Sequence, residues 1–437
     1  MTVVLLNLYE SITIFFAELC TWFNQMAESR AKGCCQYTQA TYAMMGLLKN
    51  VCGQKSMRSM EENFNTENVL TVLQIMSADA GLQEIPCVDS LNYYLSKLNP
   101  QELSYVHCKM VRHLIRSRTF DNFRFLGKYW PVVLDGTGVH AFSERHCEHD
   151  LVCRRKCRNG KEHTIYYHKI LEAKLVVGPL VLSIGTEFIE NEHENVTKQD
   201  CEQRAAKRLM ERLKKESPRL PICLQGDGLY ATEPMIRTCR EYGWKYIFTL
   251  KDKRPKEIAH NYAALRALHS CEEKTDFGSE QGIASYANHL EELSQKTEIA
   301  NVFSYEYRQK EKKQERLVKF CWLSNLEIND RNLYAMIEEG RKRWKIENEG
   351  FNRQKNGIYD IEHLNSRNSR ALKNHYLLTQ IAEILMQLYL SWNPYARKLK
   401  QSIKNTSSKL LVSLTEHSIS SEDVKYIEMH TKIHLSR

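Results

Sequence analysis

The chain has 437 residues, of which 42% are hydrophobic and only 9 are prolines, as in a soluble globular protein of two or three domains. Its 62 Lys and Arg outnumber its 53 Asp and Glu, and the net charge of +9 favours a polyanionic partner such as nucleic acid. The 14 cysteines follow no regular framework, which argues against a disulfide-stabilised secreted protein and for a reducing compartment.

The first predicted elements are helices. Residues 1–23 are apolar, but Asn7, Glu10 and Glu18 interrupt them and no basic segment precedes them. They therefore indicate an amphipathic packing helix rather than a signal peptide or a membrane span. Helical periodicity continues to about residue 128 and ends in a basic segment, residues 109–118. That segment is either a surface helix or a helix that lays cations along a phosphate backbone.

Strand patterns begin at residue 129. Gly178 and Pro179 separate the second of three β-rich runs from the third, which predicts three neighbouring strands with a hairpin turn. The three runs are residues 129–138, 164–177 and 179–188. Helix and strand patterns then alternate at residues 198–216, 220–227, about 231–242 and 244–250. This alternation after an antiparallel opening predicts a mixed α/β sheet.

The pattern changes again at residue 252. Residues 252 to about 315 are polar and weakly patterned, and a strand pattern returns at 316–326, so we interpret 252–328 as an insertion. The chain is then helical from Asp330 past Glu349. A long apolar stripe within residues 375–392 indicates either a core helix or the face of a partner helix.

Three carboxylates stand out. Asp135 and Asp227 each end an apolar strand run and are each followed by Gly, a position that also suits a turn residue or a helix cap. Glu347 lies in the helical segment RWKIENE, where alternating charges alone would indicate a solvated surface. Three carboxylates brought together would repel one another and raise their own pKa values, and hard divalent cations remove that cost. The set therefore predicts two Mg²⁺ or Mn²⁺ ions and phosphoryl transfer.

These residues lie in segments that resemble a known family. VLDGTG, LQGDGLYA and RWKIENEGFNRQK resemble, in this order, the three blocks of DDE transposases from bacterial insertion sequences. The resemblance is to the branch with an insertion domain and a YREK-like signature, and it covers about residues 90–390, including CRNGKEHTIYYHK and VTKQDCEQ. It implies a ribonuclease H-like fold, Mg²⁺-dependent cleavage at transposon ends, and attack of the freed 3′-OH on target DNA.

The resemblance also assigns roles to single residues. Asp135, Asp227 and Glu347 take the catalytic, metal-binding places, while Arg343 and Lys355 take places that contact DNA.

Two departures from the family pattern accompany this assignment. The signature Tyr falls on Gly340, and Lys355 comes eight rather than seven residues after Glu347, with Gln354 at the seventh place. They leave Glu349, about 200° away from Glu347 on a helix, as an alternative third carboxylate.

Two further residues have alternative interpretations. Trp344 either stacks on a DNA base or packs in the core. Thr137 either contacts a phosphate or completes a turn beside Asp135.

Residues 146–168 are rich in zinc-binding side chains. Four of them could enclose a structural Zn²⁺ and present neighbouring basic residues to DNA, although the spacing is not a Cys-x-x-Cys pair. The favoured set is Cys147, Cys153, Cys157 and His168, with His149 in reserve. The alternative is that these are free cysteines packed as small hydrophobes.

The complete prediction is an α/β protein with a ribonuclease H-like mixed sheet, an inserted domain, and helical regions at both ends. Its regions are a DNA-end-binding domain at 1–128, a catalytic domain at 129–251 and 329–370, the insertion at 252–328, and a helical region for dimerisation at 371–437. We expect a bacterial, cytoplasmic, nucleoid-associated DNA transposase that acts as a homodimer on terminal inverted repeats and target DNA. The alternatives are an inactive transposase-derived DNA-binding protein and a ribonuclease H-like nuclease without strand transfer.

Overall fold

The computed structural model describes residues 3–31, 33, 35–156, 162–250, 256–291, 299–311, 314–417 and 419–430. Its first part is helical, as predicted from the sequence. The helices are α1 (Val3–Phe16), α2 (Leu19–Asn24), α3 (Gln39–Val51), α4 (Met57–Phe64), α5 (Glu67–Met76), α6 (Val88–Lys97) and α7 (Pro100–Arg116), followed by the short 3₁₀ helix η1 (Asp121–Phe123). Ser56 and Asn99 cap two of them by accepting a hydrogen bond from a first-turn N–H. No helix in the described part of the chain could span a membrane.

The central sheet follows the helices. Its strands are β1 (Trp130–Phe142), β2 (Leu151–Lys156), β3 (Glu162–Val177), β4 (Leu180–Ile189), β5 (Ile222–Gly226) and β6 (Lys245–Thr249). β1, β3 and β4 are antiparallel, β5 and β6 run parallel to β1, and the order is β4-β3-β1-β5-β6. This order confirms the predicted ribonuclease H-like mixed sheet. Gly178 forms the β3–β4 turn with a φ of +58°, a backbone conformation that favours glycine. β2, which the sequence did not predict, is added at the edge beside β3.

Helices cover both faces of the sheet. Ala173 is paired with Gly185, whose Hα side lies against Leu209 of α8 (Glu202–Glu216). The next residue, Lys174, contacts Glu383 of α13 (Ser369–Trp392). Because neighbouring residues on a strand point to opposite faces, α8 and α13 cover opposite sides. The helix α9 (Glu233–Glu241) connects β5 to β6.

The predicted insertion is more ordered than its sequence indicates. It contains α10 (Lys256–Ala267), β7 (Glu272–Phe277), β8 (Gly282–Glu291), β9 (Ile299–Glu311) and β10 (Gln314–Ser324). β10 pairs with β6, so these strands extend the central sheet into one sheet of 10 strands. Only β10 was predicted. β7 to β9 were missed because their polar residues mask a buried face that includes Tyr286, Phe303 and Tyr305.

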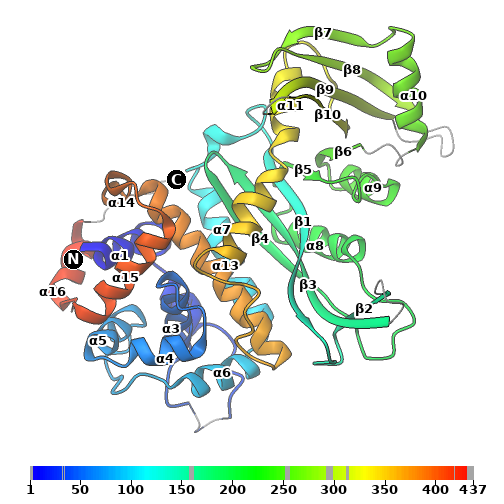
Figure 1. Cartoon of the computed structure of the whole chain (residues 1–437). Helices are drawn as coiled ribbons and strands as arrows, with labels where there is room; N and C mark the ends of the chain where they lie inside the picture. Colours follow the sequence, from blue (N-terminus) through cyan, green and yellow to red (C-terminus); the bar gives the residue numbers. More distant parts are fainter. Residues whose placement is uncertain are drawn as a thin grey trace.

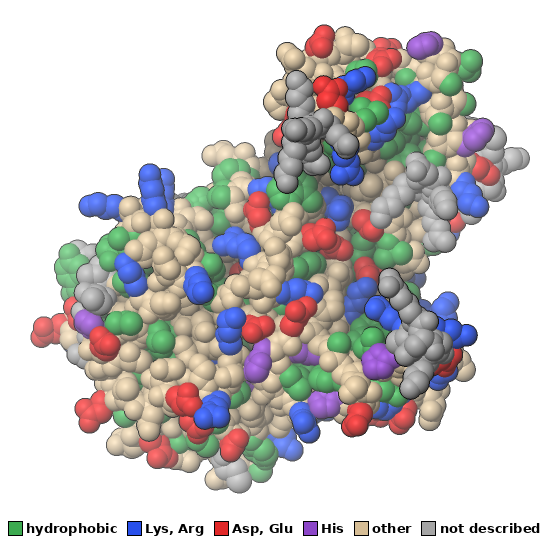
Figure 2. All heavy atoms as spheres, in the orientation of Figure 1, with side chains coloured by type: hydrophobic (Ala, Val, Ile, Leu, Met, Phe, Trp, Pro, Cys, Tyr) green, Lys and Arg blue, Asp and Glu red, His purple; other side chains and the backbone are tan. Residues whose placement is uncertain are grey.

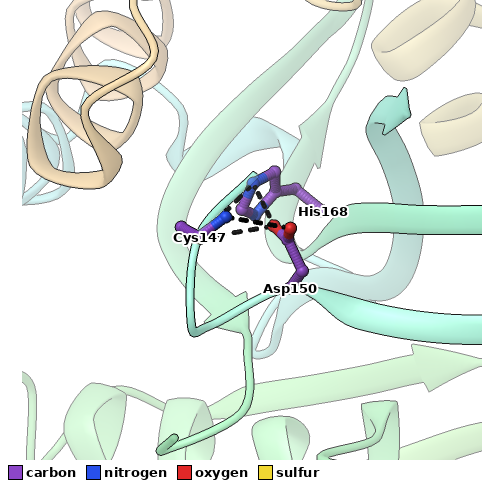
Figure 3. A group of neighbouring side chains, drawn as sticks. All are labelled: Cys147, Asp150 and His168. Atoms are coloured by element: carbon purple, nitrogen blue, oxygen red, sulfur yellow. Dashed lines mark hydrogen bonds and ion pairs between the residues drawn. The ribbon is translucent and has the colours of Figure 1, made fainter. Parts of the chain in front are cut away.

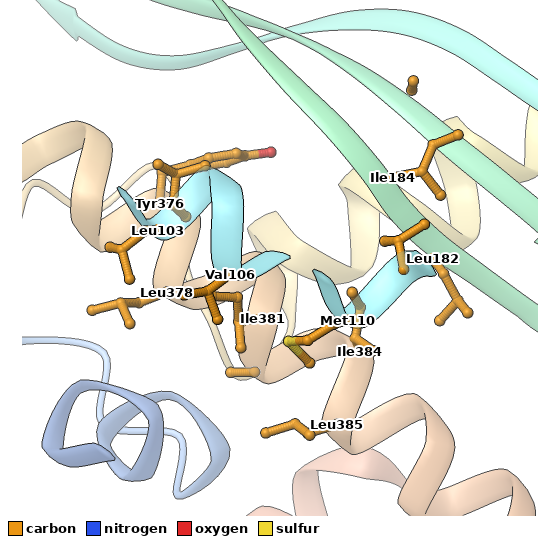
Figure 4. Packing of buried hydrophobic residues seen from close by; sticks show 14 of the residues in the cluster. Leu103, Val106, Met110, Leu182, Ile184, Tyr376, Leu378, Ile381, Ile384 and Leu385 are labelled. Carbon is orange, nitrogen blue, oxygen red and sulfur yellow. The ribbon is translucent and has the colours of Figure 1, made fainter. Parts of the chain in front are cut away.

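The last part of the chain returns to helices. They are α11 (Leu333–Arg341), the π-helix η2 (Ile346–Phe351), α12 (Asn352–Asn356), α13, α14 (Pro394–Leu399), α15 (Ile403–Glu416) and α16 (Ser421–His430). α13 is buried along almost its whole length, so the apolar stripe at 375–392 is a core helix. Figure 4 shows α13 packed with α7 and β4.

The two ends of the chain pack together. α13 contacts α3, α6 and α7, and α1 contacts α15. Figure 1 shows this helical part on one side of the sheet and the insertion at the far end. On the face drawn in Figure 2, basic side chains are interspersed with acidic ones, and no single basic patch dominates. Basic side chains on this face are therefore scattered among acidic ones.

Candidate active site

Asp135 and Asp227 occupy matching positions at two neighbouring parallel strands, Asp135 within β1 and Asp227 directly after β5. β1 and β5 pair in parallel as far as Val133 and Gln225, and each aspartate comes two residues after that pair. Because the strands run in the same direction, the two carboxylates emerge at the same level of the sheet. Asp227 also accepts a hydrogen bond from the N–H of Leu229 at 2.8 Å, which holds the turn after β5. The structure thus brings together the two positions that the strand-then-Asp-Gly pattern singled out, although β1 continues past Asp135 to Phe142.

The environment of Asp135 disfavours its negative charge. Burial, which leaves 21% of its side chain exposed, raises the pKa of Asp135 to about 6. The guanidinium of Arg343 opposes this rise in pKa, and the nearby carboxylates of Glu202 and Asp227 contribute to it. The Asp135 Oδ2 and Arg343 Nη1 atoms are 3.8 Å apart. A second cation at this position would therefore be stabilised.

Glu347 lies in η2, and Arg343 lies four residues earlier, in the turn between α11 and η2. Val133, two residues before Asp135 on β1, packs against Ile346 and Phe351 of η2, so this helix covers the face from which Asp135 points. Glu347 directly follows Ile346, so it lies close along the chain both to the residue that packs on Val133 and to Arg343, the ion-pair partner of Asp135. Glu347 is exposed and makes no ion pair with any residue that the structure describes.

Glu349 takes a different direction. Its carboxylate is 3.6 Å from Lys345 Nζ, and Lys345 in turn donates to the carbonyl of Gly178 at the β3–β4 turn. That turn lies beside the start of β1, whereas Asp135 lies in the middle of this strand, opposite Glu172. The contacts thus favour Glu347 over Glu349 as the third carboxylate.

The structure adds one acidic residue that was not predicted. Glu202 is the first residue of α8, where its side chain bonds Lys169 Nζ and accepts from the Tyr230 hydroxyl at 3.0 Å. A Cβ atom at Gly136 would lie 2.7 Å from the Glu202 carboxyl carbon, so the glycine after Asp135 makes room for this group. The segment VTKQDCEQ contains Glu202, but its spacing alone did not indicate a site residue.

The two departures from the family pattern have structural reasons. A Cβ atom at Gly340 would lie 2.7 Å from the Trp322 indole, so no larger side chain fits there. Gln354, at the family's Lys position, is buried and donates to Gln380 and Glu383 of α13. It therefore belongs to the core.

The remaining predicted DNA contacts lie at the surface or near β1. Lys355 pairs with Glu362 at 2.7 Å and borders a cavity with Gly138 of β1. Trp344 has 47% of its surface exposed, which excludes core packing. Thr137 is 9% exposed, and its hydroxyl is 3.5 Å from the carbonyl of Gly138. Trp344 thus remains available to a ligand.

A hollow opens beside Asp227. Its volume is about 1010 Å³, and it lies between the end of β5 and the insertion. Residues of both parts line it, among them Asp227, Leu229, Tyr262, Arg266 and Lys319.

The carboxylates fit hard divalent cations. All predicted ligands offer oxygen, the ligand type that Mg²⁺ and Mn²⁺ prefer, and mutual repulsion at Asp135 is relieved by a cation. In the described part of the chain, the oxygens of Asp135, Asp227 and Glu347 do not all lie within 4.8 Å of one another. The chain alone thus provides two aspartates at paired strands and the separate side chain of Glu347 rather than a closed set of metal ligands.

The predicted zinc ligands are only partly brought together. Cys147 Sγ and His168 Nε2 are 4.0 Å apart, and both contact the carboxylate of Asp150, which was not predicted (Figure 3). Cys153 pairs with Ile165, and the alternation along β3 puts this pair on the face opposite His168.

The other two zinc candidates do not join this group. His149 is engaged with the carbonyl of Asn191 at 2.9 Å. Cys157 lies outside the described residues. The expected set of four therefore changes, and Asp150 could have been suspected only from its place between the cysteines.

Comparisons with known proteins identify the family. The sequence matches the family model described as "Transposase DDE domain" over residues 126–385, more than half of the chain. Curated protein sequences give no match. The structure is similar, at 13% identity and a TM-score of 0.44, to a chain in a structure titled "Cryo-EM structure of piggyBac transposase synaptic complex with hairpin DNA (SNHP)", over 97% of this chain and 85% of that one. On the strength of the family match, the chain belongs to the transposases with a DDE domain.

Proposed function

We propose that this transposase cleaves DNA at transposon ends and joins the freed 3′-OH to target DNA, using two divalent metal ions. One observation supports this most directly: Asp135 and Asp227 lie at matching positions of the parallel strands β1 and β5, where Arg343 pairs with Asp135 and η2, which contains Glu347, packs on β1. The family's chemistry needs this combination of acidic ligands and a cation near the reacting phosphate.

Each residue has a distinct task in this proposal. Asp135, Asp227 and Glu347 would hold the ions, which when bound activate the attacking oxygen and stabilise the leaving oxygen. Arg343 lies close enough to Asp135 to orient a phosphate next to it, since a guanidinium binds phosphate with two parallel hydrogen bonds. The raised pKa of Asp135 means that its negative charge is unfavourable in the free protein, and a bound cation would stabilise that charge.

The surroundings offer room for DNA. The hollow beside Asp227 has the basic side chains of Arg266 and Lys319 at its border. The exposed indole of Trp344 could stack on a base near the ions. Lys355, on the other side of β1, would contact the phosphate backbone.

The wider proposal concerns partners and source. The ordered motifs favour a bacterial insertion sequence, a cytoplasmic, nucleoid-associated location and terminal inverted repeats as the DNA ligand. Because two ends must be paired before joining, we expect a homodimer on DNA, with residues 1–128 recognising the ends and 371–437 contributing to assembly. Sedimentation of the complex with end DNA should give two chains per pair of ends, and a single chain would contradict this.

The deciding experiment uses DNA with the element's own ends and Mg²⁺. Wild type should cut and join, Asp227→Asn should do neither, and Glu233→Gln, at a half-buried acid on α9 that pairs with Arg237, should behave as wild type. Binding without cutting by wild type would overturn the enzyme in favour of an inactive DNA-binding protein. Cutting without joining would favour a nuclease instead.

A further inference from the structure

A group of three metal-binding side chains lies away from the proposed catalytic carboxylates. Cys147 and Asp150 come from the loop between β1 and β2, and His168 comes from β3. Among the described residues, this is the group of Cys, His and acidic side chains whose ligand atoms all lie within 4.8 Å of one another. Figure 3 shows the three side chains converging from the loop and the strand.

We propose that this group is a structural zinc site with Cys147 Sγ, Asp150 Oδ1 and His168 Nε2 as ligands and His146 as the fourth. The set mixes sulfur, nitrogen and oxygen, which suits zinc better than the oxygen-preferring Mg²⁺. A site closed by four protein ligands has no open position for a substrate, so its role is structural.

The distances match zinc geometry. A tetrahedral zinc ion would place sulfur and nitrogen about 3.6 Å apart, sulfur and oxygen about 3.5 Å, and nitrogen and oxygen about 3.3 Å. The corresponding separations are 4.0 Å between Cys147 and His168, 3.3 Å between Cys147 and Asp150, and 3.0 Å between His168 and Asp150. Small side-chain movements would therefore accommodate the ion.

The carboxylate of Asp150 is oriented for this purpose. Its side chain has 0% of its surface exposed. Its Oδ2 accepts from the backbone N–H groups of His146 and Cys147 at 2.5 and 3.0 Å, which leaves Oδ1 to face Cys147 and His168. Hydrogen bonds of this kind fix a ligand in the direction of its metal. A buried carboxylate also needs a positive partner to offset the loss of hydration.

The arrangement differs from a nucleophilic triad. In a triad the thiol and the carboxylate contact different nitrogens of the imidazole, so that a proton can pass between them. Here Cys147 and Asp150 both approach Nε2 of His168. Three atoms that converge on one point are placed to share an ion rather than to relay a proton.

His146 is the best candidate for the fourth position. Its Nε2 atom is buried and has no hydrogen-bond partner among the described residues. Its ring is 4.4 Å from that of Phe142, which lies 6.1 Å from His168, so both imidazoles border the same phenyl ring. A metal would satisfy this nitrogen and the three ligands together.

The ion would fasten a loop to the sheet. Asn191, after β4, donates to the carbonyl of Asp150, so two loops meet at the site. β2 follows directly and carries Arg154, Arg155 and Lys156 at the edge of the sheet. The zinc would thus fix the position of a basic strand, and this inference does not depend on the transposase reaction.

The test is the metal content of full-length protein purified without chelator. Wild type should carry about one zinc ion per chain, and Cys147→Ser, Asp150→Asn and His168→Gln should each lower this by about tenfold. Cys201→Ser, an exposed cysteine elsewhere, should keep the ion. Zinc-free wild type, or zinc retained in Cys147→Ser and Asp150→Asn, would overturn the site.

A second measurement guards against variants that misfold. Wild type reconstituted with Co²⁺ should show a thiolate-to-cobalt charge-transfer band, which requires a cysteine ligand in a folded protein. Absence of the band in folded, cobalt-loaded wild type would exclude Cys147 as a ligand. Affinity for zinc in His146→Gln should fall by about tenfold, and unchanged affinity would reject His146 as the fourth ligand.

Discussion

The carboxylates at β1 and β5 and the Cys147 group differ in how the protein holds them. Asp150 is fully buried, and four donors fix its two oxygens. Asp135 is partly exposed and shares its surroundings with other acids, and Glu347 has no ion pair among the described residues. The chain itself brings the ligand atoms of the Cys147 group together, whereas the oxygens of Asp135, Asp227 and Glu347 do not form such a group among the described residues.

This difference follows from what each group is proposed to do. A structural site gains by being closed, because the metal then stabilises the fold. A site that must admit DNA and release a product gains by staying open, at the cost of repulsion between its acids in the free protein. Substitutions should therefore affect stability at one group and reaction rate at the other.

The largest expected effect is at Asp135. Replacing it by Asn removes a metal ligand and should lower the rate of DNA cleavage by about 10³-fold or more. The melting temperature should stay the same or rise slightly, because an unfavourable buried charge is lost. Cleavage assays and thermal unfolding on one preparation check both points. A clear fall in melting temperature would show that Asp135 supports the fold and would remove the contrast with Asp150.

The third carboxylate is tested by a matched pair on η2. Glu347→Gln should lower cleavage by about 10²- to 10³-fold, whereas Glu349→Gln, which loses only a surface pair with Lys345, should stay within about threefold of wild type. Single-turnover cleavage with saturating Mg²⁺ measures both. The reverse ranking would assign the metals to Glu349.

The next effect concerns the buried ion pair that joins β3 to α13, next to α12. Lys174 on β3 and Glu383 on α13 are both buried, with Nζ and Oε2 3.5 Å apart, and Gln354 also bonds Glu383. Lys174→Met leaves the Glu383 charge unpaired and should lower the free energy of unfolding by about 3 kcal/mol. Chemical denaturation measures this. The double variant with Glu383→Leu should regain most of the loss, and failure to do so would show that packing rather than charge dominates.

The buried imidazole of His107, which belongs to neither group, should make the stability of the fold depend on pH. Burial, helped by the positive charges of Arg212 and Lys174, lowers the pKa of His107 on α7 to about 4. At a pH above its ordinary pKa of about 6.5, His107 is neutral in both the folded and the unfolded state and does not change the free energy of unfolding. As pH falls below that value, only the unfolded chain binds the proton, so stability decreases until the pH reaches the folded pKa.

The expected size is about 2 kcal/mol between pH 7 and pH 5 for this residue. The difference in unfolding free energy between these pH values should therefore be smaller by that amount in His107→Gln than in wild type. Denaturation at several pH values in the presence and absence of chelator measures it. If chelator removed the His107 contribution, acid sensitivity would have to be assigned to the zinc group instead.

Much of the fold was predictable from local patterns. The runs that became β1, β3, β4, β5 and β6 were correct because each buried strand has a continuous apolar pattern and a turn signal. β2 was missed because its sequence, LVCRRK, contains three charges on an edge strand. For the same reason Cys153 was misplaced, since alternation along an unrecognised strand could not be counted.

The candidate site was predictable only at the ends of buried apolar runs. Asp135 follows the apolar run at the start of β1 and Asp227 directly follows β5, so their proximity follows from the pairing of these strands. Glu202 could not be placed, because its approach to Gly136 depends on how α8 crosses the sheet. The packing of Trp322 against Gly340 likewise joins two distant segments, and no local rule connects them.

The smallest expected effect comes from replacing Glu202. Its carboxylate is held by two hydrogen-bond partners, like that of Asp150, but it lies next to the carboxylates at β1 and β5. Tyr230 and Lys169 bind its carboxylate, so Glu202→Gln keeps a side chain of the same shape and should leave the fold and the maximal cleavage rate nearly unchanged. Its negative charge adds to the field at Asp135, so its loss should raise the Mg²⁺ concentration for half-maximal cleavage by about three- to tenfold. Lys169→Gln removes the opposing charge and should shift this concentration the other way. Unchanged Mg²⁺ dependence in both variants would mean that Glu202 only packs against Gly136, and the open site would then consist of Asp135, Asp227 and Glu347 alone.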